Sequence, residues 1–256
     1  MVRLERNGNK VPRGWAVLVE RAFGRCHARY VKRAMVFEAL ALTDARRQGG
    51  FKAFAPDALP RDSAGACDFP PVWREAIAKD VIRTLSDGHC AYCQSSVAAN
   101  QPGDVEHFKP KALFPTRAYR WGNYFYSCSA CNNAKRARWP VRGSFVRPDS
   151  KTRDPYERFV FHEDGRVGAA PGDRNAARTV KALRLNRKEL VKDRECAIRL
   201  TVSYARNALK WMKGETKEAQ RSAVRTLLME PLARFSAAIN QNVRRVWQEA
   251  WGDALG

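Results

Sequence analysis

Apolar residues recur at intervals of three and four along much of this chain, which is the periodicity of amphipathic helices. The pattern is clearest over residues 187–213, where Gly214 follows as a stop. Pro231 separates the last two helical patterns, because proline cannot continue a helix. The expected helices span residues 29–47, 72–85, 179–185, 187–213, 217–229 and 232–251.

Other stretches depart from this periodicity. Residues 159–167 hold two short β-prone runs around Glu163-Asp164-Gly165, which predicts a hairpin. Residues 51–71 are rich in Pro, Asp, Ser and Gly, and we expect them to be irregular. The predicted fold class is α+β and mostly helical. Three regions are expected: a basic helical or irregular segment at 1–70, a central core at 71–150, and a hairpin and helical region at 151–256.

Composition and charge narrow the class of protein. With 256 residues, 45% of them hydrophobic and 29% charged, the chain can bury a sizeable core. Its formal net charge of +21 favours polyanionic partners, although a basic protein without enzymatic activity would share it. Neither a signal peptide nor an apolar run of about 20 residues is present, so we expect a cytoplasmic protein without a membrane partner.

The seven cysteines include two C-x-x-C pairs, Cys90 with Cys93 and Cys128 with Cys131. The odd number and the tight pairing argue against a secreted disulfide framework. Four thiolates at this spacing predict a tetrahedral structural zinc site, since they leave no position open for chemistry. A redox role needs one pair rather than two. A plain zinc ribbon that only binds nucleic acid or protein remains an alternative.

The insert between the pairs carries polar residues suited to hydrolysis of phosphodiesters, a reaction that needs a base and a cation. His107 is the candidate base, because imidazole titrates near neutral pH. Glu106 is a candidate oxygen ligand for Mg²⁺ or Mn²⁺. If this segment is extended, the two side chains project to opposite faces.

Further residues complete the predicted site. Asn123 is expected to fix the ring of His107, because an imidazole base works in one tautomer and orientation. Asn132, directly after the last cysteine, is a candidate second metal ligand. Four cations are expected to hold substrate phosphates: Lys109, Lys111, Lys135 and Arg136.

The order of these motifs resembles zinc-clamped HNH endonucleases. It runs C-x-x-C, then Glu106-His107-Phe-x-Pro-Lys, then Trp-x-Asn123, then C-x-x-C-Asn132-x-x-Lys. The resemblance implies a ββα-metal core embedded in helices. It also implies that His107 is the general base, that Asn123 orients it, and that Glu106 and Asn132 hold one divalent ion. In the wider family the position of Glu106 is usually Asp, and the position of Asn132 is often His.

Two of these motifs resemble more narrowly the HNH subunit of Septu-type anti-phage systems, a branch also found with some retrons. They are Cys-Ala-Tyr-Cys and Glu-His-Phe-Lys-Pro-Lys. This match covers roughly residues 70–200. In that family the nuclease acts with an ATPase partner. The expected function is therefore a metal-dependent endonuclease of a defence complex, acting on DNA. An RNA-directed nuclease and a non-catalytic basic zinc-binding nucleic-acid-binding module are the open alternatives.

Overall fold

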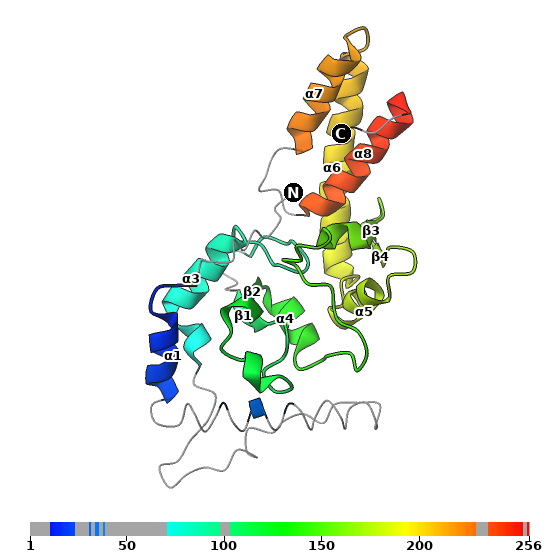
Figure 1. Ribbon diagram of the computed structural model, residues 1–256. Coiled ribbons are helices and arrows are strands. Elements are labelled where there is room, and N and C mark those ends of the chain that lie inside the picture. The colour runs from blue at the N-terminus through cyan, green and yellow to red at the C-terminus, as the bar shows by residue number, and fades with distance from the viewer. Residues whose placement is uncertain are drawn as a thin grey trace. The chain divides into compact units, whose positions relative to one another are not determined.

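The computed structural model describes residues 11–23, 31, 34, 35, 38, 71–97, 103–228, 235–252 and 255 (Figure 1). These residues form mostly helices with two small antiparallel sheets, so the predicted mixed and mostly helical class is confirmed. The described parts of 6–91 and 97–145 form one compact unit, called here the site unit. Those of 92–96 and 146–255 form a second, the helical unit. Most of residues 1–70, including most of the expected helix at 29–47, lie outside the described ranges, so the three-part division stays a prediction.

The site unit is built around one antiparallel strand pair. Strands β1 and β2 align with His107 opposite Tyr124 and Asp104 opposite Ser127. Helix α4 begins two residues after β2 and packs beside β1. The elements are α1 (Trp15–Phe23), η3 (Val72–Arg74), α3 (Ala76–Leu85), β1 (Asp104–His107), η4 (Pro115–Arg117), η5 (Trp121–Asn123), β2 (Tyr124–Ser127) and α4 (Ser129–Lys135).

Aromatic side chains make up much of the core of this unit. All four residues of β2 are buried. The Trp15 ring lies 5.4 Å from Trp121 and 5.6 Å from Tyr124, both edge to face, and its indole N–H donates to the Tyr119 carbonyl (3.1 Å). Strand β1 pairs only with β2 among the described strands. Because β2 is fully packed, it supports β1 rigidly.

The expected helix at 72–85 is interrupted. Glu75 adopts an extended conformation (φ −57°, ψ 142°), which divides the segment into η3 and α3. Each piece buries its own apolar side chains, Trp73 on η3 and Ala78 and Ile82 on α3. The break therefore orients Trp73 independently of α3, and Trp73 becomes part of the site described below.

The helical unit follows the periodicity of its sequence closely. The predicted hairpin and the predicted helices at 187–213 and 217–229 are confirmed within two residues. The helix expected at 179–185 begins earlier, at Arg174, because Asp173 caps it by accepting from the Ala176 amide (2.9 Å). The elements are η6 (Pro155–Arg158), β3 (Phe159–Phe161), β4 (Val167–Ala169), α5 (Arg174–Ala182), α6 (Lys188–Trp211), α7 (Lys217–Leu228) and α8 (Ser236–Trp251).

The hairpin turn is fixed against α6. Gly165 has φ +79°, and a Cβ at this position would lie 2.2 Å from the Val191 carbonyl oxygen, so only glycine fits. Arg194 of α6 is buried and donates to the carbonyls of Gly165 (2.5 Å) and Leu185 (3.3 Å). None of the described helices has both the length and the apolar character needed to cross a bilayer.

Candidate active site and metal centre

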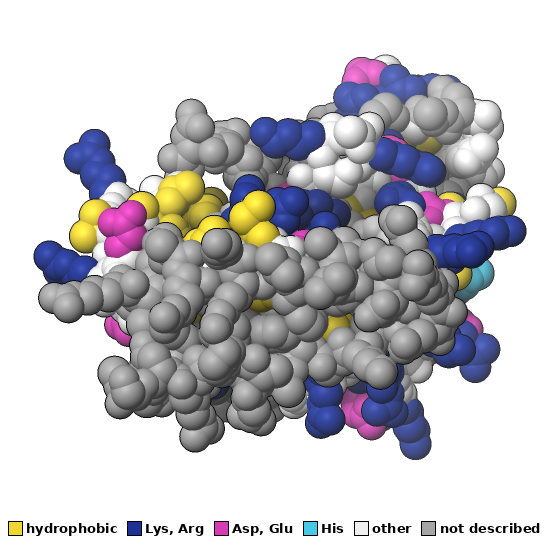
Figure 2. Space-filling view, turned by 60° about the horizontal axis from the view of Figure 1, so that its bottom comes forward, with side chains coloured by type: hydrophobic (Ala, Val, Ile, Leu, Met, Phe, Trp, Pro, Cys, Tyr) yellow, Lys and Arg dark blue, Asp and Glu magenta, His cyan; other side chains and the backbone are white. Residues whose placement is uncertain are grey.

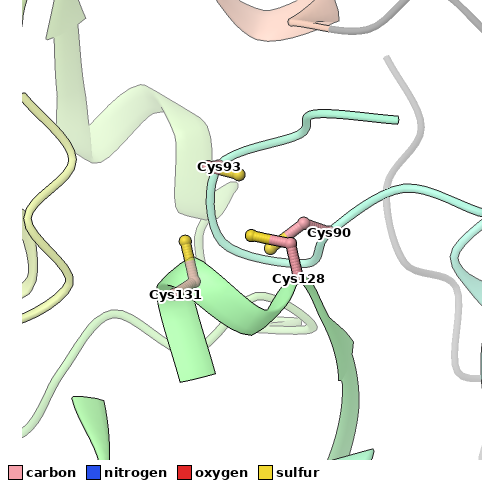
Figure 3. A group of neighbouring side chains, drawn as sticks. All are labelled: Cys90, Cys93, Cys128 and Cys131. Carbon is pink, nitrogen blue, oxygen red and sulfur yellow. The ribbon is translucent and has the colours of Figure 1, made fainter. Parts of the chain in front are cut away.

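The four paired cysteines come together. Cys90 and Cys93 lie on the loop after α3, while Cys128 and Cys131 lie at the start of α4, and Figure 3 shows their sulfurs pointing toward one another. All four sulfurs lie within 4.8 Å of one another, and none is in a disulfide. Zn–S bonds of about 2.3 Å in a tetrahedron place sulfurs about 3.8 Å apart. The arrangement therefore fits a four-thiolate metal site such as zinc.

Polar groups surround this cluster. The thiol of Cys93 lies 3.2 Å from the Ser95 hydroxyl and 3.9 Å from a guanidinium nitrogen of Arg187. The Cys90 sulfur lies 3.8 Å from the Ser127 hydroxyl. Such donors stabilise the negative charge of thiolates when a metal is bound. The neighbouring His89 lies outside the cluster, with Nδ1 bonded to the Asp87 carbonyl (2.8 Å).

His107 lies at the end of β1 and is held on three sides. Its Nε2 is 3.0 Å from the backbone carbonyl of Ala118, and its ring meets Trp73 (4.7 Å) and Tyr124 (5.0 Å) edge to face. Because a carbonyl can only accept, Nε2 carries the hydrogen. In the neutral ring Nδ1 then holds a free lone pair, and this nitrogen makes no hydrogen bond to another described residue.

The environment keeps this ring neutral. Burial lowers the pKa of His107 to about 3, and the positive charges of Lys111 and Lys135 act in the same direction. The hydrogen bond to Ala118 opposes them. The imidazole is therefore unprotonated at physiological pH and able to accept a proton at Nδ1. A phosphate that offsets the charge of Lys111 would raise the pKa and make the ring a stronger base.

Asn123 acts on the loop between the strands rather than on the ring. Its amide nitrogen donates to the carbonyls of Lys109 (3.0 Å) and Arg117 (3.0 Å), and its oxygen accepts from the Lys109 amide (2.8 Å). It thus joins the two ends of the loop that carries Ala118. The expected direct contact with His107 is replaced by an indirect one, through the backbone that supplies the carbonyl.

Glu106 is not free at the surface. Its carboxylate is paired with Lys135, and both side chains are almost completely buried. The Lys135 ammonium also donates to the His107 backbone carbonyl (2.7 Å). Lys135 is therefore an internal counter-ion between α4 and β1, which differs from its expected place among the phosphate-binding cations.

Asp104 is a candidate site residue that the sequence interpretation missed. It lies two positions before Glu106 on β1, and its carboxylate accepts from the Asn132 side-chain amide (3.0 Å). This bond turns the nitrogen of Asn132 toward Asp104 and leaves its oxygen available. The i, i+2 spacing of Asp104 and Glu106 was a usable signal, because alternate strand residues share a face.

Part of this set lines one cavity of about 520 Å³, which neither Asn123 nor Lys135 lines. Its wall includes His107 and three oxygen-bearing side chains, those of Asp104, Glu106 and Asn132. Carboxylate and amide oxygens are the donor types that Mg²⁺ and Mn²⁺ prefer. Of the four predicted phosphate-binding cations, Lys111 and Arg136 line the cavity, while Lys109 lies over the Phe114 ring (4.9 Å).

Comparison with known proteins gives two relatives, while no family model matches the chain. The chain is 22% identical to Septu protein PtuB of Bacillus mycoides (strain KBAB4) over 150 residues, covering 48% of this chain and 51% of the relative. It is 32% identical to Septu protein PtuB of Bacillus thuringiensis over 65 residues, a quarter of each chain. The matches thus span about half of one relative and a quarter of the other. The motifs around the cysteine pairs predicted this relationship, and the similarity of the chain to Septu protein PtuB is confirmed.

Proposed function

We propose that this chain is a divalent-metal-dependent endonuclease of the HNH type. The observation that carries the proposal is the position of His107, which lines a cavity with Asp104, Glu106 and Asn132 and whose Nδ1 makes no hydrogen bond to another described residue. A buried base beside oxygen ligands, with cations on the cavity wall, is what hydrolysis of a phosphodiester requires. The strand pair followed by α4 also matches the ββα order expected for this family.

In the proposed reaction His107 is the general base. Nδ1 accepts a proton from a water molecule, and the oxygen of that water attacks the phosphorus in line with the leaving group. The P–O3′ bond breaks, and the leaving O3′ oxygen takes up a proton from solvent water, which gives a 5′-phosphate and a 3′-hydroxyl. The Ala118 carbonyl stabilises the ring as it becomes charged, since it accepts from Nε2–H throughout.

The acidic side chains hold the cation in this proposal. Asp104 and Asn132 present oxygen atoms from β1 and α4, and Glu106 adds a second carboxylate. A bound divalent ion would supply positive charge to the phosphate and the leaving oxygen. Lys135 limits the negative charge of the site before the ion and the substrate arrive. Zinc at the four cysteines would hold the start of α4, and hence Asn132, in place.

The similarity to Septu protein PtuB supports a proposal for the cellular role. We propose that the chain serves in an anti-phage defence complex, with an ATPase partner that controls the nuclease and with DNA as the substrate. The net charge of +21 suits a polyanionic substrate. RNA remains the competing substrate, because the cavity residues address a backbone phosphate rather than a base.

The experiment is a cleavage assay of the zinc-loaded protein with the proposed ATPase partner, in Mg²⁺, in Mn²⁺ and in EDTA. Labelled duplex DNA, single-stranded DNA and structured RNA are compared. The variant is His107→Ala, and the control is His162→Ala, which changes an exposed histidine of the β3–β4 hairpin. Cleavage should require the divalent ion and His107 but not His162. Equal cleavage by wild type and His107→Ala would reject the assignment.

One observation favours the second candidate, a binding module without catalysis. The carboxylate of Glu106 is already neutralised by Lys135, as in a site that only has to accept a phosphate. That candidate predicts salt-sensitive binding of nucleic acid with no divalent-dependent cutting on any of the three substrates.

A further inference from the structure

The wall of the cavity carries cations from four separate segments of the chain. Lys111 lies on the loop after β1, and Arg136 lies at the C-terminal end of α4. Arg74 of η3 and Lys79 of α3 also line the cavity, although both precede the first cysteine pair and were not among the predicted site residues. The cations therefore extend beyond the segment that carries the candidate chemistry.

Trp73 links η3 to the centre of the site. Its ring is buried, meets the His107 ring edge to face at 4.7 Å, and lies 4.1 Å beneath the Lys111 ammonium. An ammonium over an indole face is held by the ring's quadrupole. Arg74 follows Trp73 directly, so its backbone position is fixed relative to His107 and Lys111.

The cavity wall carries more positive charge than is needed to bind one phosphodiester. Lys135 compensates Glu106, which leaves Asp104 as the remaining acidic group on the wall. No ion pair or hydrogen bond joins the side chain of Arg74 or Lys79 to another described residue. On the face shown in Figure 2, Lys and Arg side chains are also more prominent than acidic ones among the coloured residues.

We propose that Arg74 and Lys79 form a second phosphate site, which binds a backbone phosphate next to the one at His107. The ligand class is a nucleic-acid strand, contacted through its phosphates and without reading of the bases. The strand would pass from Lys111 and Arg136 across His107 to η3 and the start of α3. This inference rests on the proposed function, because it takes the phosphate at His107 as the one to be cut.

The test measures binding rather than cleavage. The full zinc-loaded chain carrying His107→Ala is titrated with a fluorescent DNA duplex at several salt concentrations, so that no cutting interferes. Lys79→Gln and Arg74→Gln are compared with Arg83→Gln, which removes an exposed cation of α3 that does not line the cavity. Each lost phosphate contact should make the slope of log K against log salt shallower by about 0.9.

The expected result is a shallower slope for Lys79→Gln and for Arg74→Gln, with Arg83→Gln unchanged. Equal slopes for Lys79→Gln, Arg74→Gln and Arg83→Gln would overturn the second phosphate site, whether or not the wild type cuts nucleic acid. Shallower slopes in a protein that never cuts would support the phosphate site and reject the nuclease. The two proposals therefore fail separately.

Discussion

The ammonium group of Lys135, at the end of α4, is paired with the carboxylate of Glu106 on β1, and both side chains are shielded from water. The substitution Lys135→Met removes the cation and leaves a buried charge without compensation. Loss of one partner of a buried pair costs about 3–5 kcal/mol. We expect the free energy of unfolding, measured by denaturant titration with zinc bound, to fall by that order.

The double variant Lys135→Met/Glu106→Gln is the matched control, because it removes both charges and should recover most of the lost stability. Added Mg²⁺ should stabilise Lys135→Met more than wild type, since the cation can compensate Glu106. A loss below about 1 kcal/mol in the single variant, the range of exposed pairs, would contradict the burial of this pair.

Asn123 is predicted to act through the backbone of the loop. Asn123→Ala removes three hydrogen bonds to Lys109 and Arg117, each contributing about 1 kcal/mol. We expect lower stability, faster hydrogen exchange at the Lys109 amide, and loss of cleavage. Asn132→Ala should abolish cleavage with little change in Lys109 exchange. Unchanged exchange in Asn123→Ala would show that other contacts hold the loop.

The depressed pKa of His107 predicts a pH dependence of stability. The folded value is about 3 and the ordinary value is 6.5. Between these pH values the unfolded chain binds a proton at His107 that the folded chain does not. The contribution of the neutral His107 ring to the free energy of unfolding is therefore fully present above pH 6.5 and is lost as the pH falls toward 3. Its slope is at most about 1.4 kcal/mol per pH unit.

The measurement for this prediction is the stability difference between wild type and His107→Gln at several pH values. The difference should shrink as the pH falls from 6.5, because only the wild type carries the unfavourable protonation. In parallel, the ring proton resonances of His107 in NMR spectra should stay constant from pH 8 to pH 4.5. Titration of those resonances near pH 6.5 would contradict the buried environment.

The cysteine cluster predicts one zinc per chain. Cys131→Ser should lower the zinc content, the solubility and the melting temperature, because metal binding is coupled to folding of the loops that carry the ligands. Cys196→Ser is the control, since this cysteine is exposed on α6. Elemental analysis of the purified protein checks the metal, and absence of zinc from wild type would refute the centre.

Arg136 predicts opposite effects on stability and binding. Its φ of +45° at the end of α4 is unfavourable for any residue with a Cβ, at about 1–3 kcal/mol. Arg136→Gly should therefore raise the melting temperature while weakening binding of nucleic acid. Arg136→Gln keeps the strain and removes the charge, so it should weaken binding without the gain in stability. Calorimetry and salt-dependent binding separate the two effects.

The parts that the sequence predicts well depend on local patterns. The cysteine spacing predicted a cluster that the structure brings together, and the periodicity of residues 187–213 predicted α6 to within two residues. The break at Glu75 was not predicted, because its reason is the burial of Trp73 against residues far along the chain.

The contacts of the site were harder to predict for the same reason. Asn123 bonds backbone carbonyls, which carry no sequence signal. Lysine is a residue type usually found at the surface, and only the tertiary position of Glu106 makes Lys135 a buried counter-ion. Arg194 likewise interrupts an apolar face because its partners are carbonyls of a turn and a loop.

The group that orients the His107 ring is a main-chain oxygen, at Ala118. A substitution cannot delete a main-chain atom. Any residue at position 118 therefore still has the carbonyl oxygen that accepts from His107. This hydrogen bond is lost when the course of the chain changes. The length of the loop and the Asn123 amide that joins it to Lys109 and Arg117 therefore matter more to the orientation of His107 than which side chain stands at position 118.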